Sequence, residues 1–127
     1  MCCDFDFSLQ ELHLSMNRYY TVNIPDNYHH TSLSRLFMND SNIENWEDIC
    51  KLGRAFPSIE SLTVINSNIK CLADCEQYSE FSHLTCLNIS HCCLTCWNDV
   101  DRFRKFPVLD HLRISGVPFL EVRVKRV

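Results

Sequence analysis

The residues with the most evident chemical potential are thiols and one imidazole between positions 86 and 96. The group comprises Cys86, His91, Cys92, Cys93 and Cys96. Cys93 and Cys96 have the Cys-x-x-Cys spacing of zinc ligands or of a redox-active pair. A structural zinc site needs a second such pair, and Cys71 and Cys75 upstream have helical spacing instead. A redox pair usually opens a helix that follows a strand, whereas Cys93 precedes the expected helix. We therefore expect no metal site and no redox centre.

Two aspartates, Asp48 and Asp99, recur at matched positions in the sequence. They could act as general acids or bases, but acids in the first turn of two helices explain them better. The sequence has no Gly-x-Ser-x-Gly motif and no glycine-rich phosphate loop, and it contains only 2 glycines. We expect a protein that is not an enzyme and that needs no cofactor.

The elements that would position these residues are indicated by a phrase that recurs five times. It is a loose Leu-x-x-Leu-x-Leu, with a small or polar residue three places later and an apolar residue two places beyond. The five phrases begin at Leu9, Leu33, Ile59, Leu84 and Leu109, at intervals of 24, 26, 25 and 25 residues. This regular period predicts a leucine-rich repeat.

The spacing within each phrase predicts a short strand. Two apolar residues two places apart lie on one face of a strand, because side chains alternate along it. The sequence thus predicts an α/β fold, a right-handed β-α solenoid of about five coils. Parallel strands line its concave face and helices its convex face. We expect a single domain over 1–127, with coils near 9–32, 33–58, 59–83, 84–108 and 109–121.

The small or polar residue of each phrase should end the strand and hydrogen-bond the turn or a neighbouring coil. Four coils have a fitting residue at this slot: Asn17, Ser41, Ser67 and Cys92. Val117 does not fit, which suggests that the repeat array is ending.

The segments between phrases predict helices in alternate coils. Trp46, Ile49, Leu52 and Phe56 form one inward stripe at helical spacing, and a second stripe consists of Trp97, Val100, Phe103 and Phe106. Asn45 can cap the first helix. A less regular helix is expected at about 71–78, and 23–30 is interpreted as a loop.

Alternation along the strands also predicts a binding surface. The residues that flank the inward leucines should face outwards on the concave sheet. With two residues that extend the rows, the candidates are Glu11, His13, Arg35, Phe37, Ser61, Thr63, Ile65, Asn88, Ser90, His111 and Arg113, with Cys86 in the same row. Exposed apolar groups among charges suit a protein partner. For Phe37, packing on its neighbours is an equal alternative.

Composition limits the classes of partner. The net charge is −4 and no basic stripe is present, so we expect no nucleic-acid binding. No secretory signal and no run of 18 apolar residues occurs, so we expect no membrane span. The 9 cysteines then indicate reduced thiols in the cytosol. Neither end has the polar face of a capping repeat, so we expect a monomeric fragment of a longer protein.

Several of these segments resemble the leucine-rich repeat domain of tubulin-folding cofactor E-like proteins. They are residues 46–53 (WEDICKLG), 56–58 (FPS), 66–68 (NSN), 97–101 (WNDVD), 106–109 (FPVL) and 116–120 (GVPFL), with 12–17 and 20–22 similar to an earlier coil. The resemblance covers about 9–120. It implies a non-enzymatic protein of the cytoplasm and cytoskeleton that binds α-tubulin and affects heterodimer assembly and microtubule stability. The family's ubiquitin-like domain is not visible here. The repeat alone would also suit a generic scaffold of phosphatase-regulating or axonemal type.

Overall fold

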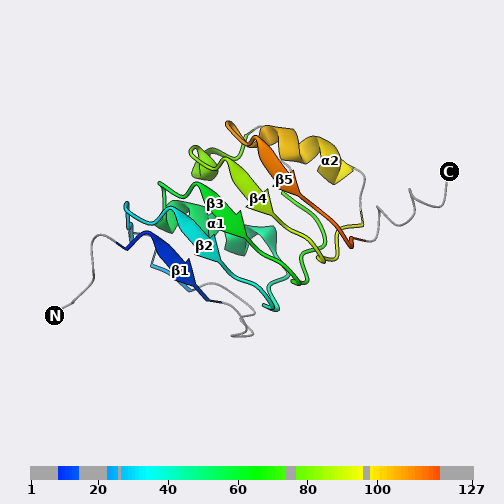
Figure 1. The fold of residues 1–127 in the computed structure, drawn as a ribbon, viewed down its shortest axis with the longest axis horizontal. Helices are drawn as coiled ribbons and strands as arrows, with labels where there is room; N and C mark the ends of the chain where they lie inside the picture. The colour runs from blue at the N-terminus through cyan, green and yellow to red at the C-terminus, as the bar shows by residue number, and fades with distance from the viewer. Residues whose placement is uncertain (1–8, 15–22, 26, 74–76, 96–97, 118–127) are drawn as a thin grey trace.

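The computed structural model describes residues 9–14, 23–25, 27–73, 77–95 and 98–117. Over these residues the fold is α/β and is built on a five-stranded parallel sheet (Figure 1). The strands follow one another across the sheet in chain order: β1 Glu11–His13, β2 Arg35–Phe37, β3 Ser61–Thr63, β4 Cys86–Asn88 and β5 His111–Arg113. The expected parallel strands of an α/β fold are confirmed.

The register of the sheet follows the repeat in the sequence. The middle residues of neighbouring strands are paired across the sheet, and they are Leu12, Leu36, Leu62, Leu87 and Leu112. Each is the second leucine of its phrase. Leu36, Leu62 and Leu87 are at most 1% exposed, so the inward direction assigned to this position is correct in the central strands.

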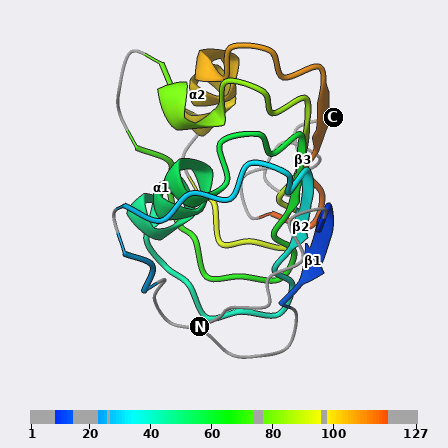
Figure 2. The same ribbon diagram turned by 90° about the vertical axis from the view of Figure 1, so that its left-hand side faces the viewer.

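The helices lie on one side of the sheet and the other side is open (Figure 2). The core fills the space between these two layers. It combines the leucine-phrase residues with apolar side chains of the helices and loops, among them Ile49, Leu52, Phe81 and Phe106. We call the side of the sheet away from the helices the open face.

A left-handed residue ends the strand segment in four successive coils. Asp40, Asn66, His91 and Gly116 have φ values of 60°, 63°, 57° and 64°. The backbone N–H of each of the first three donates to a carbonyl of the next coil, at 2.7–3.0 Å. Asp, Asn, His and Gly tolerate this conformation better than other residues. The turn therefore depends on the residue before the expected polar slot.

The slot residues themselves are buried and only partly hydrogen-bonded. The Cys92 Sγ–H points to the Val64 carbonyl at 3.4 Å, and Ser67 Oγ lies 3.1 Å from Cys92 Sγ. The expected bond to a neighbouring coil is thus present at Cys92. Ser41 Oγ has no hydrogen-bond partner in the described structure, and Val117 is fully buried. Asn17 lies outside the described residues.

Helix α1 spans Trp46–Ala55 and agrees with the prediction in its position and its buried stripe. Asn45 occupies the N-cap position, but its side chain makes no capping hydrogen bond, so that expectation is wrong. Asn45 is exposed, and water can solvate its amide instead.

The second helical segment is shorter than expected. Helix α2 spans Asn98–Arg102 and continues as the 3₁₀ helix η2, Phe103–Lys105. Phe103 and Phe106 are buried as predicted. Val100 is 37% exposed, which corrects its assignment to the inward stripe. Trp97 lies outside the described residues.

The middle coil departs further from the prediction. Residues 71–73 and 77–78 are not helical, and a 3₁₀ helix, η1 at Ser79–Phe81, follows instead. Tyr78 explains the difference, because its N–H donates to the Lys105 carbonyl at 2.9 Å and its hydroxyl to the Ala73 carbonyl at 2.6 Å. The first bond holds the Tyr78 backbone to the next coil, and the second ties its side chain to Ala73 within the same coil, so neither follows a helix axis. The described part of 23–30 forms neither helix nor strand, as expected.

Candidate functional site

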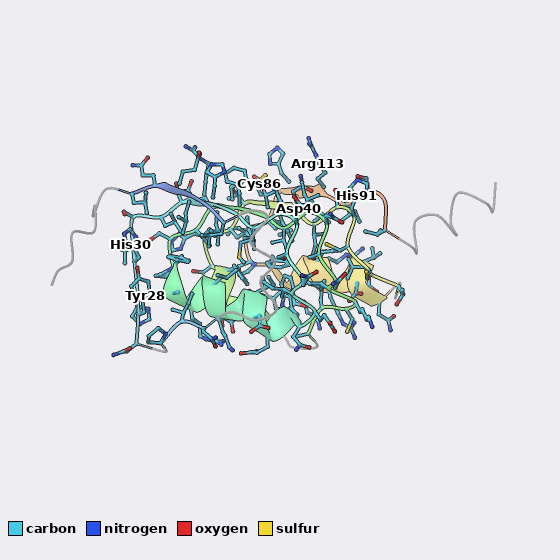
Figure 3. All side chains as sticks on the ribbon, turned by 90° about the horizontal axis from the view of Figure 1, so that it is seen from below. Tyr28, His30, Asp40, Cys86, His91 and Arg113 are labelled. Carbon is cyan, nitrogen blue, oxygen red and sulfur yellow. The ribbon has the colours of Figure 1, made fainter. Side chains whose placement is uncertain are left out.

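The open face carries two rows of side chains that run across the strands. One row is Glu11, Arg35, Ser61, Cys86 and His111, and the other is His13, Phe37, Thr63, Asn88 and Arg113. The residues of each row are paired in register, so the structure brings together ten of the expected candidates. In Figure 3, Cys86 and Arg113 stand on the side of the sheet away from the helices.

At the β1–β2 end of the open face, the side chains bond to and stack on one another. Glu11 accepts hydrogen bonds from Arg35 Nε at 2.7 Å and from His13 Nε2 at 2.9 Å. The His13 and Phe37 rings stack with centroids 4.3 Å apart and planes within 5°. The hydrogen bonds from His13 and Arg35 lower the pKa of Glu11, so its carboxylate stays charged at neutral pH.

Phe37 packs on a neighbouring side chain, which is the second of the two interpretations of this residue. Its ring is half-buried beneath His13, so packing on a neighbour accounts for much of its surface. The Arg35 guanidinium is occupied by Glu11. This end of the face offers a partner little charge that is not already paired.

The middle of the face is less accessible than its two ends. Ser61, Thr63 and Ile65 are half-buried. Ser90 is only 4% exposed, which corrects its place among the exposed candidates. Its hydroxyl donates to the Arg113 carbonyl at 3.5 Å and accepts from the Ser115 N–H at 3.2 Å, so it joins two coils beneath the surface.

The β4–β5 end contains an open groove of about 470 Å³, lined mainly by residues of β4 and β5. Its lining includes Thr63, Cys86, Asn88, His111, Leu112 and Arg113. Asp110 also lines it and is held by His111 Nδ1 at 2.6 Å. Sequence reasoning assigned Leu112 only to the core, yet it is 39% exposed at the last described strand.

The thiols do not assemble a metal or redox site in the described structure. Cys86 is exposed, Cys92 is buried and Cys93 is half-buried, while Cys96 lies outside the described residues. No group of three or more His, Cys, Asp or Glu in the described ranges is placed to hold a metal ion. Burial raises the pKa of Cys92, which keeps that thiol protonated and a poor nucleophile.

The repeated aspartates lie in the first turns of α1 and α2, as interpreted from the sequence. Asp99 has a structural role that the sequence did not indicate. Its buried Oδ1 accepts the Leu72 N–H at 3.0 Å and pairs with Arg102 at 2.9 Å. It therefore ties α2 to the loop of the preceding coil.

No helix in the described ranges is long and apolar enough to cross a membrane.

Comparison with known proteins gives a consistent set of relatives. No family model matches the chain. It is 33% identical over 115 residues to the human protein named tubulin-specific chaperone cofactor E-like protein, which covers 89% of this chain and 27% of the relative. The rat protein of that name matches equally. The Caenorhabditis elegans protein of that name is 20% identical over 111 residues. The chain spans about a quarter of the length of these relatives, 26–27%.

Proposed function

This chain is a relative of the tubulin-specific chaperone cofactor E-like proteins, and we propose that it is a protein-binding module that acts on tubulin. The observation that carries the proposal is 33% identity over 89% of the chain to relatives with this name. The similarity covers 89% of the chain.

We propose further that the module is a leucine-rich repeat solenoid of about five coils. Five parallel strands in chain order, with the same residue of each phrase in register, support this architecture. So does the left-handed residue that recurs at intervals of 25 or 26 residues from Asp40 to Gly116. Such an array presents one continuous sheet surface to a partner.

The proposed partner is α-tubulin and the proposed contact surface is the open face. The relatives' printed names support tubulin as the partner, and the resemblance found in the sequence supports the α subunit. The accessible rows across β1–β5 support the choice of face. In this proposal the chain is monomeric, binds no nucleic acid, acts in the cytoplasm and on the cytoskeleton, and affects heterodimer assembly without catalysing a reaction.

A capture experiment with site-specific cross-linking tests the partner and the face together. The 127-residue chain is immobilised and incubated with purified tubulin heterodimer. One version carries a photo-reactive amino acid in place of Ser61 on the open face. The matched control carries it in place of Arg104 on the helix side, where the side chain is also solvent-accessible.

We expect tubulin to be retained, with α-tubulin cross-linked from position 61 and not from position 104. Absence of tubulin retention would overturn the proposed function. Retention with cross-links only from position 104 would contradict the open face as the contact surface. In a separate capture from a cell lysate, retention of a phosphatase without tubulin would favour the generic scaffold instead.

A further inference from the structure

The same backbone hydrogen bonds join neighbouring coils at each of the four strand interfaces. Directly before each of β1 to β4, one carbonyl accepts two consecutive N–H groups of the next coil at 2.8–3.0 Å. These carbonyls belong to Gln10, Ser34, Glu60 and Thr85. Directly after each of these strands, one N–H donates to a carbonyl of the next coil at 2.8–3.0 Å. These N–H groups belong to Leu14, Met38, Val64 and Ile89. Each coil therefore attaches to the next by one repeated backbone pattern.

The equivalent groups of the fifth coil have no partner among the described residues. They are the Asp110 carbonyl, directly before β5, and the Ile114 N–H, directly after it. The His111 N–H and the Arg113 carbonyl are bonded to the coil of β4, so by alternation the N–H and carbonyl of Leu112 point the other way. β5 lies at one end of the described sheet (Figure 1), and we call its side away from β4 the β5 edge.

The inward side chains at the β5 edge are incompletely covered. Leu112 is 39% exposed, whereas its equivalents in β2, β3 and β4 are at most 1% exposed. Leu109 and Ile114 are half-buried, whereas their equivalents in the same three coils are at most 2% exposed. Those equivalents have a described coil on both sides, and the fifth coil has one on a single side. Unpaired backbone groups and uncovered aliphatic side chains thus coincide at this edge.

The four described interfaces define the chemistry that fits the β5 edge. In each of them the incoming strand is parallel and places a leucine beside the leucine of its neighbour. It also supplies two consecutive N–H groups and, two residues after the second, a carbonyl. Backbone bonds to a sheet edge contribute affinity, and alternate side chains contribute specificity. A strand added to β5 therefore needs aliphatic residues opposite Leu112 and Ile114, and it needs no charge.

We propose that the β5 edge binds an extended segment of a partner protein as an added parallel strand. Two consecutive N–H groups of the segment donate to the Asp110 carbonyl, one of its carbonyls accepts from the Ile114 N–H, and an aliphatic side chain lies on Leu112. The inference goes beyond the proposed function, because this edge is a different surface from the open face.

The probe is an acetylated and amidated heptapeptide with the sequence of residues 59–65, Ile-Glu-Ser-Leu-Thr-Val-Ile, which contains β3 of this fold. One version is N-methylated at its serine, because the Ser61 N–H is a donor to the preceding coil. The matched control is N-methylated at its valine, because the Val64 N–H points to the opposite side of the strand. NMR titration of the isotope-labelled 127-residue chain measures the affinity and locates the bound peptide.

Two variants of the protein test the apolar contact. Leu112→Ser removes the leucine at the β5 edge. The matched control is Val100→Ser, because Val100 is 37% exposed but lies on α2, on the helix side of the molecule. Circular dichroism checks that each variant keeps the fold.

We expect the largest amide shifts between Asp110 and Ser115. N-methylation at the serine should weaken binding about two- to tenfold through the lost hydrogen bond, whereas N-methylation at the valine should change it less than about twofold. Leu112→Ser should weaken binding about three- to tenfold through the lost apolar contact, and Val100→Ser less than about twofold.

Equal effects of the two N-methyl groups, shifts confined to β1, or no binding at millimolar peptide would overturn the inference. A stable dimer of the chain in sedimentation experiments without peptide would assign the edge to a second copy and overturn it too. So would binding that appears only after residues 118–127 are deleted, because those residues would then be the occupant. The peptide test involves no tubulin, so its failure would leave the proposed function intact.

Discussion

Gly53→Ala should destabilise the protein, although it replaces glycine in the interior of an α-helix. A Cβ at Gly53 in α1 would lie 2.9 Å from Glu80 Cβ, 2.9 Å from Phe81 Cε1 and 3.0 Å from Phe81 Cζ. These separations are shorter than van der Waals contact. Phe81 is fully buried and its ring centroid lies 5.8 Å from that of Phe106, so the ring has little room to move.

Two opposed contributions set the change in the free energy of unfolding caused by Gly53→Ala. Alanine in place of a helix-interior glycine contributes about 1 kcal/mol of stabilisation. Overpacking of a tight core costs about 1–3 kcal/mol. The new methyl group would meet both Glu80 Cβ, which is fixed to the backbone, and the buried Phe81 ring. We therefore place the cost of overpacking in the upper part of that range. The free energy of unfolding should therefore fall by about 1–2 kcal/mol.

Urea unfolding followed by tryptophan fluorescence measures this change. The midpoint should shift to lower urea with an unchanged m value, because the surface exposed on unfolding is the same. The matched background is Phe81→Leu, which removes part of the ring that blocks the new methyl group. In that background Gly53→Ala should cost less than in the wild-type chain, because only the contact with Glu80 Cβ remains. Greater stability of Gly53→Ala in the wild-type background would refute the reasoning.

Three further predictions concern other contacts. Asp99→Ala should lower the free energy of unfolding by about 2–3 kcal/mol, because it leaves the buried Leu72 N–H without an acceptor. The control Asp101→Ala, at an exposed site, should change it by less than about 0.5 kcal/mol, and urea unfolding compares the two variants. Gly116→Ala should cost about 1–2 kcal/mol, because φ is +64° and its methyl would overlap the His91 ring; thermal unfolding checks it, and an unchanged midpoint would contradict it. The Glu11 carboxyl should titrate below its ordinary pKa by NMR, so its contribution to stability is full above the unfolded-state pKa and is lost as pH falls through the folded-state pKa. An ordinary or raised pKa would exclude His13 and Arg35 as its hydrogen-bond partners.

The strand positions and their register could be predicted from the sequence. A leucine in the same place of every phrase must face the core, and the period places it beside its equivalents, as with Leu36, Leu62 and Leu87. The same alternation places Glu11 and Arg113 on the opposite face. Such features depend on one coil at a time, so local pattern is sufficient.

The helices could be predicted only in part. Helix α1 follows its apolar stripe, since Trp46, Ile49 and Leu52 have the full helical period. The middle coil has an apolar pattern too, but Tyr78 bonds to Lys105 in the next coil and to Ala73 in its own. Whether this segment forms a helix therefore depends on Lys105, which is 27 positions from Tyr78 and outside any local sequence pattern.

The sequence by itself determined that this chain repeats, where each strand lies and which side chains share the open face. Tertiary structure alone decided which of those side chains remain available. Arg35 on β2 and Arg113 on β5 both lie on the open face, yet Arg35 pairs with the Glu11 carboxylate of the neighbouring strand and Arg113 forms no ion pair with an acid among the described residues. The physical reason is that pairing and burial depend on the side chains of the adjacent coil, so two arginines on the same face differ in the charge they can offer a partner.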